Sequence, residues 1–137
     1  MLAFAETLTM LHGLVRWLAI AAASWMLALA LVMLVRRRGL GALERRSQTA
    51  LTGSLHGQVG LGVIIALLLN GSGAPPFEGR VATLVGHALG GVLMAACATL
   101  ATVMTRRAAS HRAQGLWLAV CAGLAWLLLG KWAVSIP

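Results

Sequence analysis

The chain of 137 residues is 60% hydrophobic and only 10% charged, whereas a soluble domain is about half apolar and about a quarter charged. This composition excludes an ordinary water-soluble domain and indicates an integral membrane protein. The net charge of +8 comes mostly from arginines. They lie in short clusters between long apolar runs, as membrane-flanking charges do, so we expect no binding to nucleic acid.

Four apolar segments are long enough to cross the hydrocarbon of a bilayer, which takes about 20 helical residues. They cover residues 7–35, 47–69, 80–105 and 113–134. The connections between them are short, and short connections place successive helices side by side and antiparallel. The sequence therefore predicts an all-α fold, an integral membrane four-helix up-down-up-down bundle, as a single transmembrane domain over residues 1–137.

Two arginine-rich segments join the predicted helices on one side of the membrane. They are "RRRGLGALERR" at 36–46 and "RRAASHR" at 106–112. The other side holds "NGSGAPPFEGR" at 70–80 and the two termini, which carry few charges. Because arginine-rich loops stay in the cytoplasm, both termini are expected on the outer, periplasmic or extracellular, side. We expect a multi-pass protein of the bacterial inner (cytoplasmic) membrane, surrounded by the lipid bilayer.

Ionisable side chains inside a membrane are costly and by default indicate a functional site. Apart from Arg80 and Lys131 near the outer ends of the spans, those within or at the edge of the predicted spans are, in chain order, His12, Arg16, His56, His87 and His111. No Asp or Glu lies inside a predicted span, which argues against a carboxylate relay for protons or cations. Cys97 and Cys121 form no CxxC or CxxCH motif, which excludes covalently attached haem.

Glycines lie three or four residues away from three of these histidines, and therefore on the same helix face. They are Gly53 and Gly60 around His56, Gly90 and Gly91 after His87, and Gly115 after His111. Two interpretations follow. Small residues let transmembrane helices pack closely, and bare backbone also leaves room for a flat porphyrin whose iron binds the histidine.

The predicted depth of each histidine in the membrane indicates which two of them can bind the same iron. At about 1.5 Å per residue, His12 lies roughly 8 Å and His87 roughly 10 Å below the outer ends of their helices. The first and third helices are diagonal in a sequential bundle, so these two imidazoles can face each other across its core. We expect them to hold a haem b, with Arg16 on the same face either pairing with a propionate or extending to the outer interface.

The other two histidines match less well in depth. His56 lies roughly 14 Å from the cytoplasmic end of its helix, whereas His111 is at the cytoplasmic edge, a difference of roughly 10 Å. A second haem between them is left open. Otherwise His56 hydrogen-bonds to Ser54, Gln58 or a backbone carbonyl, and His111 is a solvated interfacial residue. If a histidine pairing fails, the alternative axial ligands are the methionines Met26, Met33, Met94 and Met104.

Three segments resemble those of small four-helix bacterial membrane proteins described as b-type cytochrome-like. The segments are "LHGLVRW" at 11–17, "HGQVGLGVIIALLL" at 56–69 and "GHALGGVLMAACATL" at 86–100. Two departures from that family's pattern are the position of the glycine in the first segment, and Ala88 where the family has proline. The resemblance implies a membrane b-type cytochrome with His12, His56 and His87 at the matching positions, and does not say which of them bind iron.

The sequence thus predicts a membrane b-type haem protein that carries electrons as a small subunit of a larger redox complex. It has no evident catalytic residues, so we expect an electron-transfer subunit rather than a self-sufficient enzyme, with other membrane redox subunits as partners and quinone binding left open. One alternative is a non-catalytic structural subunit that packs against partner helices or pigments. Another is a copper-handling membrane protein, against which the lack of Met or Cys clusters argues.

Overall fold

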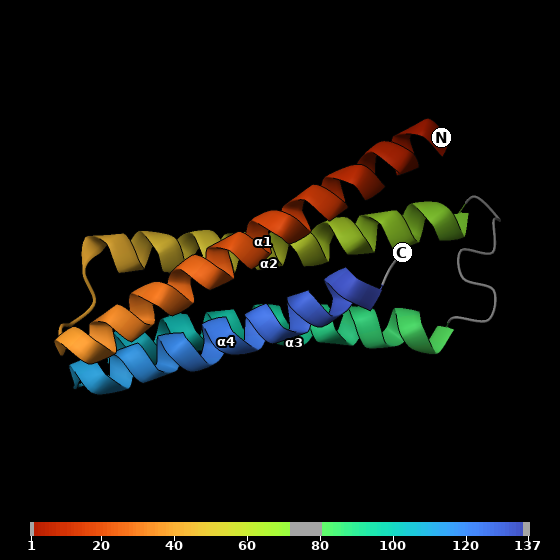
Figure 1. Cartoon of the computed structure of the whole chain (residues 1–137). Coiled ribbons are helices and arrows are strands. Elements are labelled where there is room, and N and C mark those ends of the chain that lie inside the picture. The colour runs from red at the N-terminus through yellow and green to blue at the C-terminus, as the bar shows by residue number, and fades with distance from the viewer. Residues whose placement is uncertain (1, 72–80, 136–137) are drawn as a thin grey trace.

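The computed structural model describes residues 2–71 and 81–135, which form four α-helices. Their bounds are Leu2–Arg36 for α1, Ala42–Gly71 for α2, Val81–Arg107 for α3 and His111–Ser135 for α4. The helices run alternately in opposite directions, so α1 begins and α4 ends at the same end of the bundle (Figure 1). The predicted all-α four-helix bundle is confirmed. Most of the predicted turn between the second and third helices, residues 72–80, lies outside the described residues.

Three of the helices, α1, α2 and α4, begin before the predicted apolar segments, and local contacts mark the beginnings of α2 and α4 and the end of α1. α1 and α2 begin at residues 2 and 42 instead of 7 and 47. α1 ends before Arg37, whose φ of 52° is the left-handed conformation typical of a helix C-terminus. Before α2, the Gly41 N–H donates to the Glu44 carboxylate at 3.0 Å, as in a capping box. Before α4, Ser110 Oγ accepts from the Ala113 N–H at 3.2 Å.

Each helix packs against two neighbours, in the cyclic order α1, α2, α3, α4. Consequently α1 and α3 are diagonal, as are α2 and α4. Small residues let α1 pack closely in the bundle: Ala19, Ala23 and Ala30 are completely buried, and where α4 meets α1 a Cβ added to Gly115 would lie 2.8 Å from Leu34 Cδ2. Small side chains allow transmembrane helices to approach each other in this way.

Large apolar side chains cover much of the outside of the bundle. Leu14, Trp17, Leu18 and Leu67 are each more than half exposed. All four helices are long and apolar enough to cross a membrane. Because lipid, unlike water, solvates such a surface without cost, the arrangement is that of a multi-pass membrane protein with four candidate spans.

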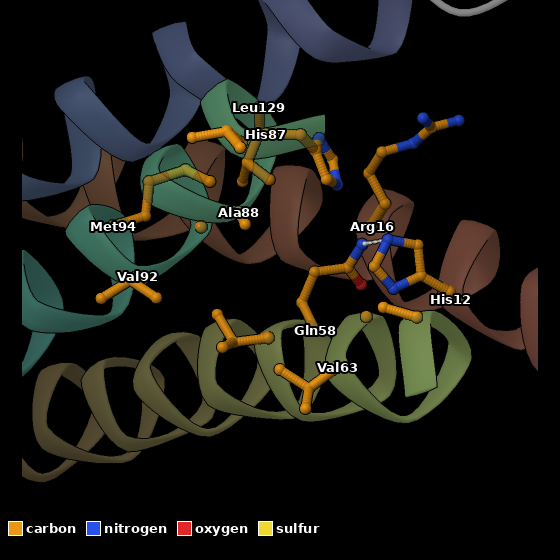
Figure 2. A pocket seen from close by; sticks show the side chains of 14 residues that line it. His12, Arg16, Gln58, Val63, His87, Ala88, Val92, Met94 and Leu129 are labelled. Atoms are coloured by element: carbon orange, nitrogen blue, oxygen red, sulfur yellow. Dashed lines mark hydrogen bonds between the residues drawn. The ribbon is translucent and has the colours of Figure 1, made fainter. Parts of the chain in front are cut away.

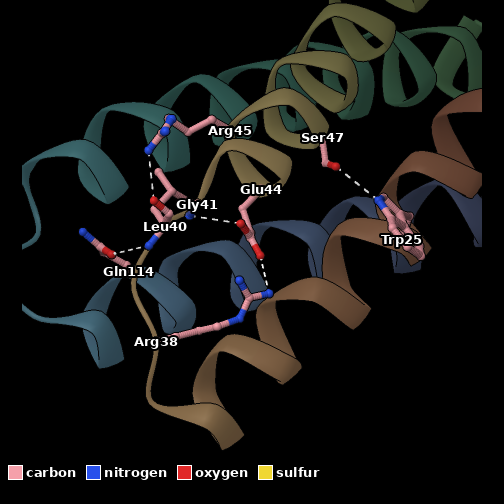
Figure 3. Close-up of polar contacts among 8 residues, drawn as sticks. All are labelled: Trp25, Arg38, Leu40, Gly41, Glu44, Arg45, Ser47 and Gln114. Atoms are coloured by element: carbon pink, nitrogen blue, oxygen red, sulfur yellow. Dashed lines mark hydrogen bonds and ion pairs between the residues drawn. The ribbon is translucent and has the colours of Figure 1, made fainter.

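The two arginine-rich connections lie at one end of the bundle (Figure 1), which we call the arginine-rich end and whose polar contacts Figure 3 shows. Glu44 is completely buried there and forms an ion pair with Arg38. The Leu40 N–H donates to Gln114 Oε1 at 3.1 Å, and Arg45 donates to the Leu40 carbonyl at 2.9 Å. These contacts tie the connection between α1 and α2 to the beginning of α4.

Candidate cofactor cavity

A cavity of about 310 Å³ lies towards the opposite end of the bundle, lined mainly by α1, α2 and α3 and by Leu129 of α4. Its polar lining consists of His12 and Arg16 from α1, Gln58 from α2 and His87 from α3, and the rest of the lining is aliphatic side chains, glycine and Met94 (Figure 2). Ligand sites are typically apolar cavities of about 300–1,000 Å³ with a few converging polar groups. This cavity therefore has the size and the lining of a ligand site.

Small residues and the divergence of α1 create the cavity. The first turns of α1 splay away from the other helices at this end (Figure 1). Gly62 and Gly91 line the space, and a Cβ added to either would approach the opposite wall. It would lie 3.4 Å from His12 Cε1 at Gly62 and 3.4 Å from Val59 Cγ2 at Gly91. Bare backbone at these two positions keeps the cavity open.

His12 and His87 face each other across this cavity from the diagonal helices α1 and α3. Their ring centroids are 6.0 Å apart, and their planes are inclined by 62°. These are the two histidines predicted to pair because their depths in the membrane match, and the structure brings them together. No other described histidine lines the cavity.

Gln58 extends from α2 to His12. The Gln58 side-chain amide and His12 Nε2 are 2.9 Å apart, so the amide N–H donates and the ring nitrogen accepts. Gln58 is 7% exposed, and its Oε1 is buried without a hydrogen-bond partner, as is His12 Nδ1. Buried polar atoms without partners are costly. The chain alone therefore leaves part of the polar lining unsatisfied, as expected where a ligand completes a site.

Arg16 lies one helical turn after His12 and also lines the cavity. Its guanidinium carbon is 6.0 Å from the centre of the Trp17 ring, and its Nε is buried without a hydrogen-bond partner. Figure 2 shows the guanidinium pointing away from the pair formed by His12 and Gln58. This position suits a carboxylate at the edge of the cavity, because the guanidinium fork binds carboxylates with two parallel hydrogen bonds.

The cavity opens sideways, between α2 and α3. Val63, Val85 and Val92 line it, and each is 49–55% exposed on the outside of the bundle. In a membrane protein such an opening faces hydrocarbon. A flat apolar ligand larger than the enclosed space can therefore extend from the cavity into the bilayer.

His56 and its glycines do not belong to this cavity. The His56 Nδ1–H donates to the Thr52 carbonyl at 2.8 Å, and Nε2 lies 3.4 Å from Thr99 Oγ1 of α3. The His56 side chain is exposed, and a Cβ added to Gly53 or Gly60 would meet open space. The strip of Gly53, His56 and Gly60 is therefore an outer face of α2 and not the wall of a buried site.

Two further predicted residues also lie elsewhere. His111 is exposed as the first residue of α4, at the arginine-rich end, where its ring faces Gly39. Gly90 is partly buried but does not line the cavity, whereas its neighbour Gly91 does.

The residues fit a haem better than a bare metal ion. In the described parts of the chain, no three His, Cys, Asp or Glu side chains cluster to hold a metal ion, and zinc or copper sites use three or four protein ligands. A porphyrin supplies four nitrogens itself, so its iron needs only one or two protein ligands. His12 and His87, whose ring centroids are 6.0 Å apart, would be those ligands.

Several residues of the cavity were not predicted as part of the site, among them Gln58 and Gly62. Gln58 is two residues after His56, and side chains two apart point to different sides of a helix. His56 and Gln58 therefore point to different sides of α2, so that when one of them faces the cavity the other faces away from it. The sequence signal for Gln58 was its polarity at membrane depth, a property that His56 shares.

No family model, curated protein or solved structure matches this chain. Its function is inferred from the geometry of the cavity.

Proposed function

We propose that this protein is a membrane b-type cytochrome that holds one haem b between His12 and His87 and carries electrons. One observation carries the proposal: two imidazoles from diagonal helices lie 6.0 Å apart at an otherwise apolar cavity. The resemblance of the segments around these two histidines to b-type cytochrome-like proteins supports it. The lateral opening provides the route by which a flat ligand enters.

The chain's own residues have distinct parts in this function. Bound haem supplies reversible one-electron chemistry at its iron. The imidazoles of His12 and His87 would hold the iron, and the aliphatic walls exclude water. Arg16 provides a positive charge for a carboxylate at the rim. To expose its Nε2, His12 must release the hydrogen bond from Gln58.

Electron carriage fits the described lining of the cavity better than catalysis does. The lining has two histidines but no carboxylate, hydroxyl or thiol that could act as a nucleophile or pair with a histidine as in a catalytic triad. Donor and acceptor would then be other membrane redox subunits. The arginine-rich end lies in the cytoplasm under the positive-inside rule, which places the haem nearer the outer surface of a bacterial inner membrane and both termini outside.

The first test is the absorption spectrum of the full chain purified in detergent from cells supplied with haem. We expect a Soret band, a sharp α-band after reduction with dithionite, and one haem per chain in a pyridine haemochrome assay. A colourless protein with native helical content by circular dichroism would refute the proposal. Two haems per chain would contradict the single-haem assignment.

The ligands are tested by comparing four equivalent substitutions. His12→Ala and His87→Ala should each abolish the low-spin spectrum. His56→Ala and His111→Ala remove the same side chain outside the cavity and should leave haem content and spectrum unchanged. Loss of the spectrum in His56→Ala with retention in His12→Ala would show that the haem lies elsewhere. If His87→Ala alone keeps a low-spin spectrum, the neighbouring Met94 becomes the ligand to test.

A second candidate is a structural subunit that packs against partner helices. Gly53, Gly57 and Gly60 leave open space on α2, and such faces suit close helix packing. This candidate predicts a folded but colourless protein, so the spectrum separates it from the first. Copper handling has weaker support, because two histidines supply too few ligands for copper.

A further inference from the structure

A second cleft, of about 410 Å³, lies at the arginine-rich end and is separate from the haem cavity. It is formed where the connection between α1 and α2 meets the end of α3 and the beginning of α4. The residues that matter for its chemistry are Arg45, Thr105, Arg106, His111 and Gln114. None of them has a part in the proposed electron transfer.

Thr105 is the most unusual residue of this cleft. Its side chain is completely buried, and its hydroxyl has no hydrogen-bond partner. By contrast, Thr99 and Thr102 on the same helix both donate to the carbonyl four residues earlier, at 3.0 Å. Because a buried hydroxyl without a partner is costly, a ligand that bonds to it would be stabilised in this cleft.

The charge of the cleft is positive. Arg45 and Arg106 line it, and no carboxylate does. Glu44 is near in sequence, but it is paired with Arg38 and with the Gly41 N–H. Arg45 uses Nη1 for the Leu40 carbonyl, which leaves further donors of its guanidinium for an anion.

Gln114 holds the cleft in shape. Its Oε1 accepts from the Leu40 N–H at 3.1 Å, and its Nε2 donates to the Ala108 carbonyl at 3.4 Å. Both ends of the amide are thus occupied, and they join the two connections of this end. The cleft is therefore preorganised, with Arg45, Arg106 and Thr105 as the groups left to contact a ligand.

We propose that this cleft binds a phosphate oxyanion, either the headgroup phosphate of an anionic phospholipid or free phosphate. Arginine forks match the geometry of phosphate oxygens, and the Thr105 hydroxyl can donate to one of them. The cleft lies at the ends of the membrane-spanning helices, at the level where headgroups lie. Basic pockets between transmembrane helices on the cytoplasmic side bind anionic headgroups.

The two sources are distinguished by titrating the full chain in neutral detergent. Native mass spectrometry measures the binding of phosphatidylglycerol, with phosphatidylcholine as the zwitterionic control of zero net charge, in the presence and absence of inorganic phosphate. Saturable binding of phosphatidylglycerol that phosphate does not displace assigns the cleft to lipid. Displacement by millimolar phosphate assigns it to the free ion. Equal binding of the two lipids together with no binding of phosphate overturns the proposal.

Matched variants distinguish a specific anion site from general attraction between the arginines and an anion. Thr105→Val changes no charge and should weaken binding about fivefold, whereas Thr105→Ser keeps the hydroxyl and should retain it. The double variant Arg45→Gln/Arg106→Gln should weaken binding about tenfold more than Arg46→Gln/Arg107→Gln, which has the same net charge but lies outside the cleft. Equal losses in the two double variants, or full affinity in a Thr105→Val protein of native helical content, would overturn the proposal.

Discussion

Replacing Gln58 by leucine should strengthen haem binding, although it removes one of the few polar groups in the cavity. In the structure, the Gln58 amide donates to His12 Nε2 at 2.9 Å. If His12 binds iron through Nε2, this hydrogen bond exists only in the haem-free protein and opposes binding. Leucine has a similar size, so the cavity keeps its shape while the competing bond disappears.

The expected change in the Kd for haem follows from the loss of that one hydrogen bond. A neutral hydrogen bond contributes about 0.5–1.5 kcal/mol to stability, net of exchange with water. Gln58 is 7% exposed, so water does not replace the lost partner of His12 in the haem-free state. Binding should become more favourable by the same amount, which at about 1.4 kcal/mol per factor of ten is a two- to tenfold lower Kd.

The assay is a titration of haem-free protein in detergent with haemin, followed at the Soret band. Gln48→Leu is the matched control, since Gln48 is also buried in α2 but does not line the cavity, and its Kd should not change. A higher Kd for Gln58→Leu would refute the reasoning. It would show that Gln58 supports the bound state of His12, with coordination through Nδ1.

Three predictions concern stability, measured by equilibrium unfolding in mixed detergent micelles. Arg38→Ala leaves the buried Glu44 carboxylate without its counterion and should destabilise the fold by about 1–3 kcal/mol, less than for a fully buried pair because Arg38 is 41% exposed; no loss would mean that solvent reaches Glu44. Gly115→Leu should cost about 1–3 kcal/mol by forcing α1 and α4 apart at Leu34, and an unchanged stability would contradict the close packing. Arg37→Gly should stabilise by up to about 1 kcal/mol, because glycine adopts its φ of 52° without strain; a loss would point to a contact of the Arg37 side chain.

Position along each helix could be predicted from the sequence. The lengths of the apolar segments predicted four antiparallel helices, and the arginine clusters predicted that the connections of α1–α2 and α3–α4 share one end. A helix rises by a constant amount per residue, so counting residues placed His12 and His87 at matching depths on diagonal helices. These predictions depend only on chain geometry and on the cost of charge in hydrocarbon.

Which face of each helix points into the bundle could be seen only in the tertiary structure. Successive residues are about 100° apart around a helix, so His56 and Gln58 cannot both face inward. Because both are polar residues at membrane depth, polarity does not show which of the two does. Packing turned Gln58 towards His12 and left His56 outside, with its bonds to Thr52 and Thr99. In a soluble protein water would mark the outer face with polar residues, but lipid is as apolar as the core. The sequence therefore determined depth and direction, while contacts between helices decided which polar side chains share a cavity.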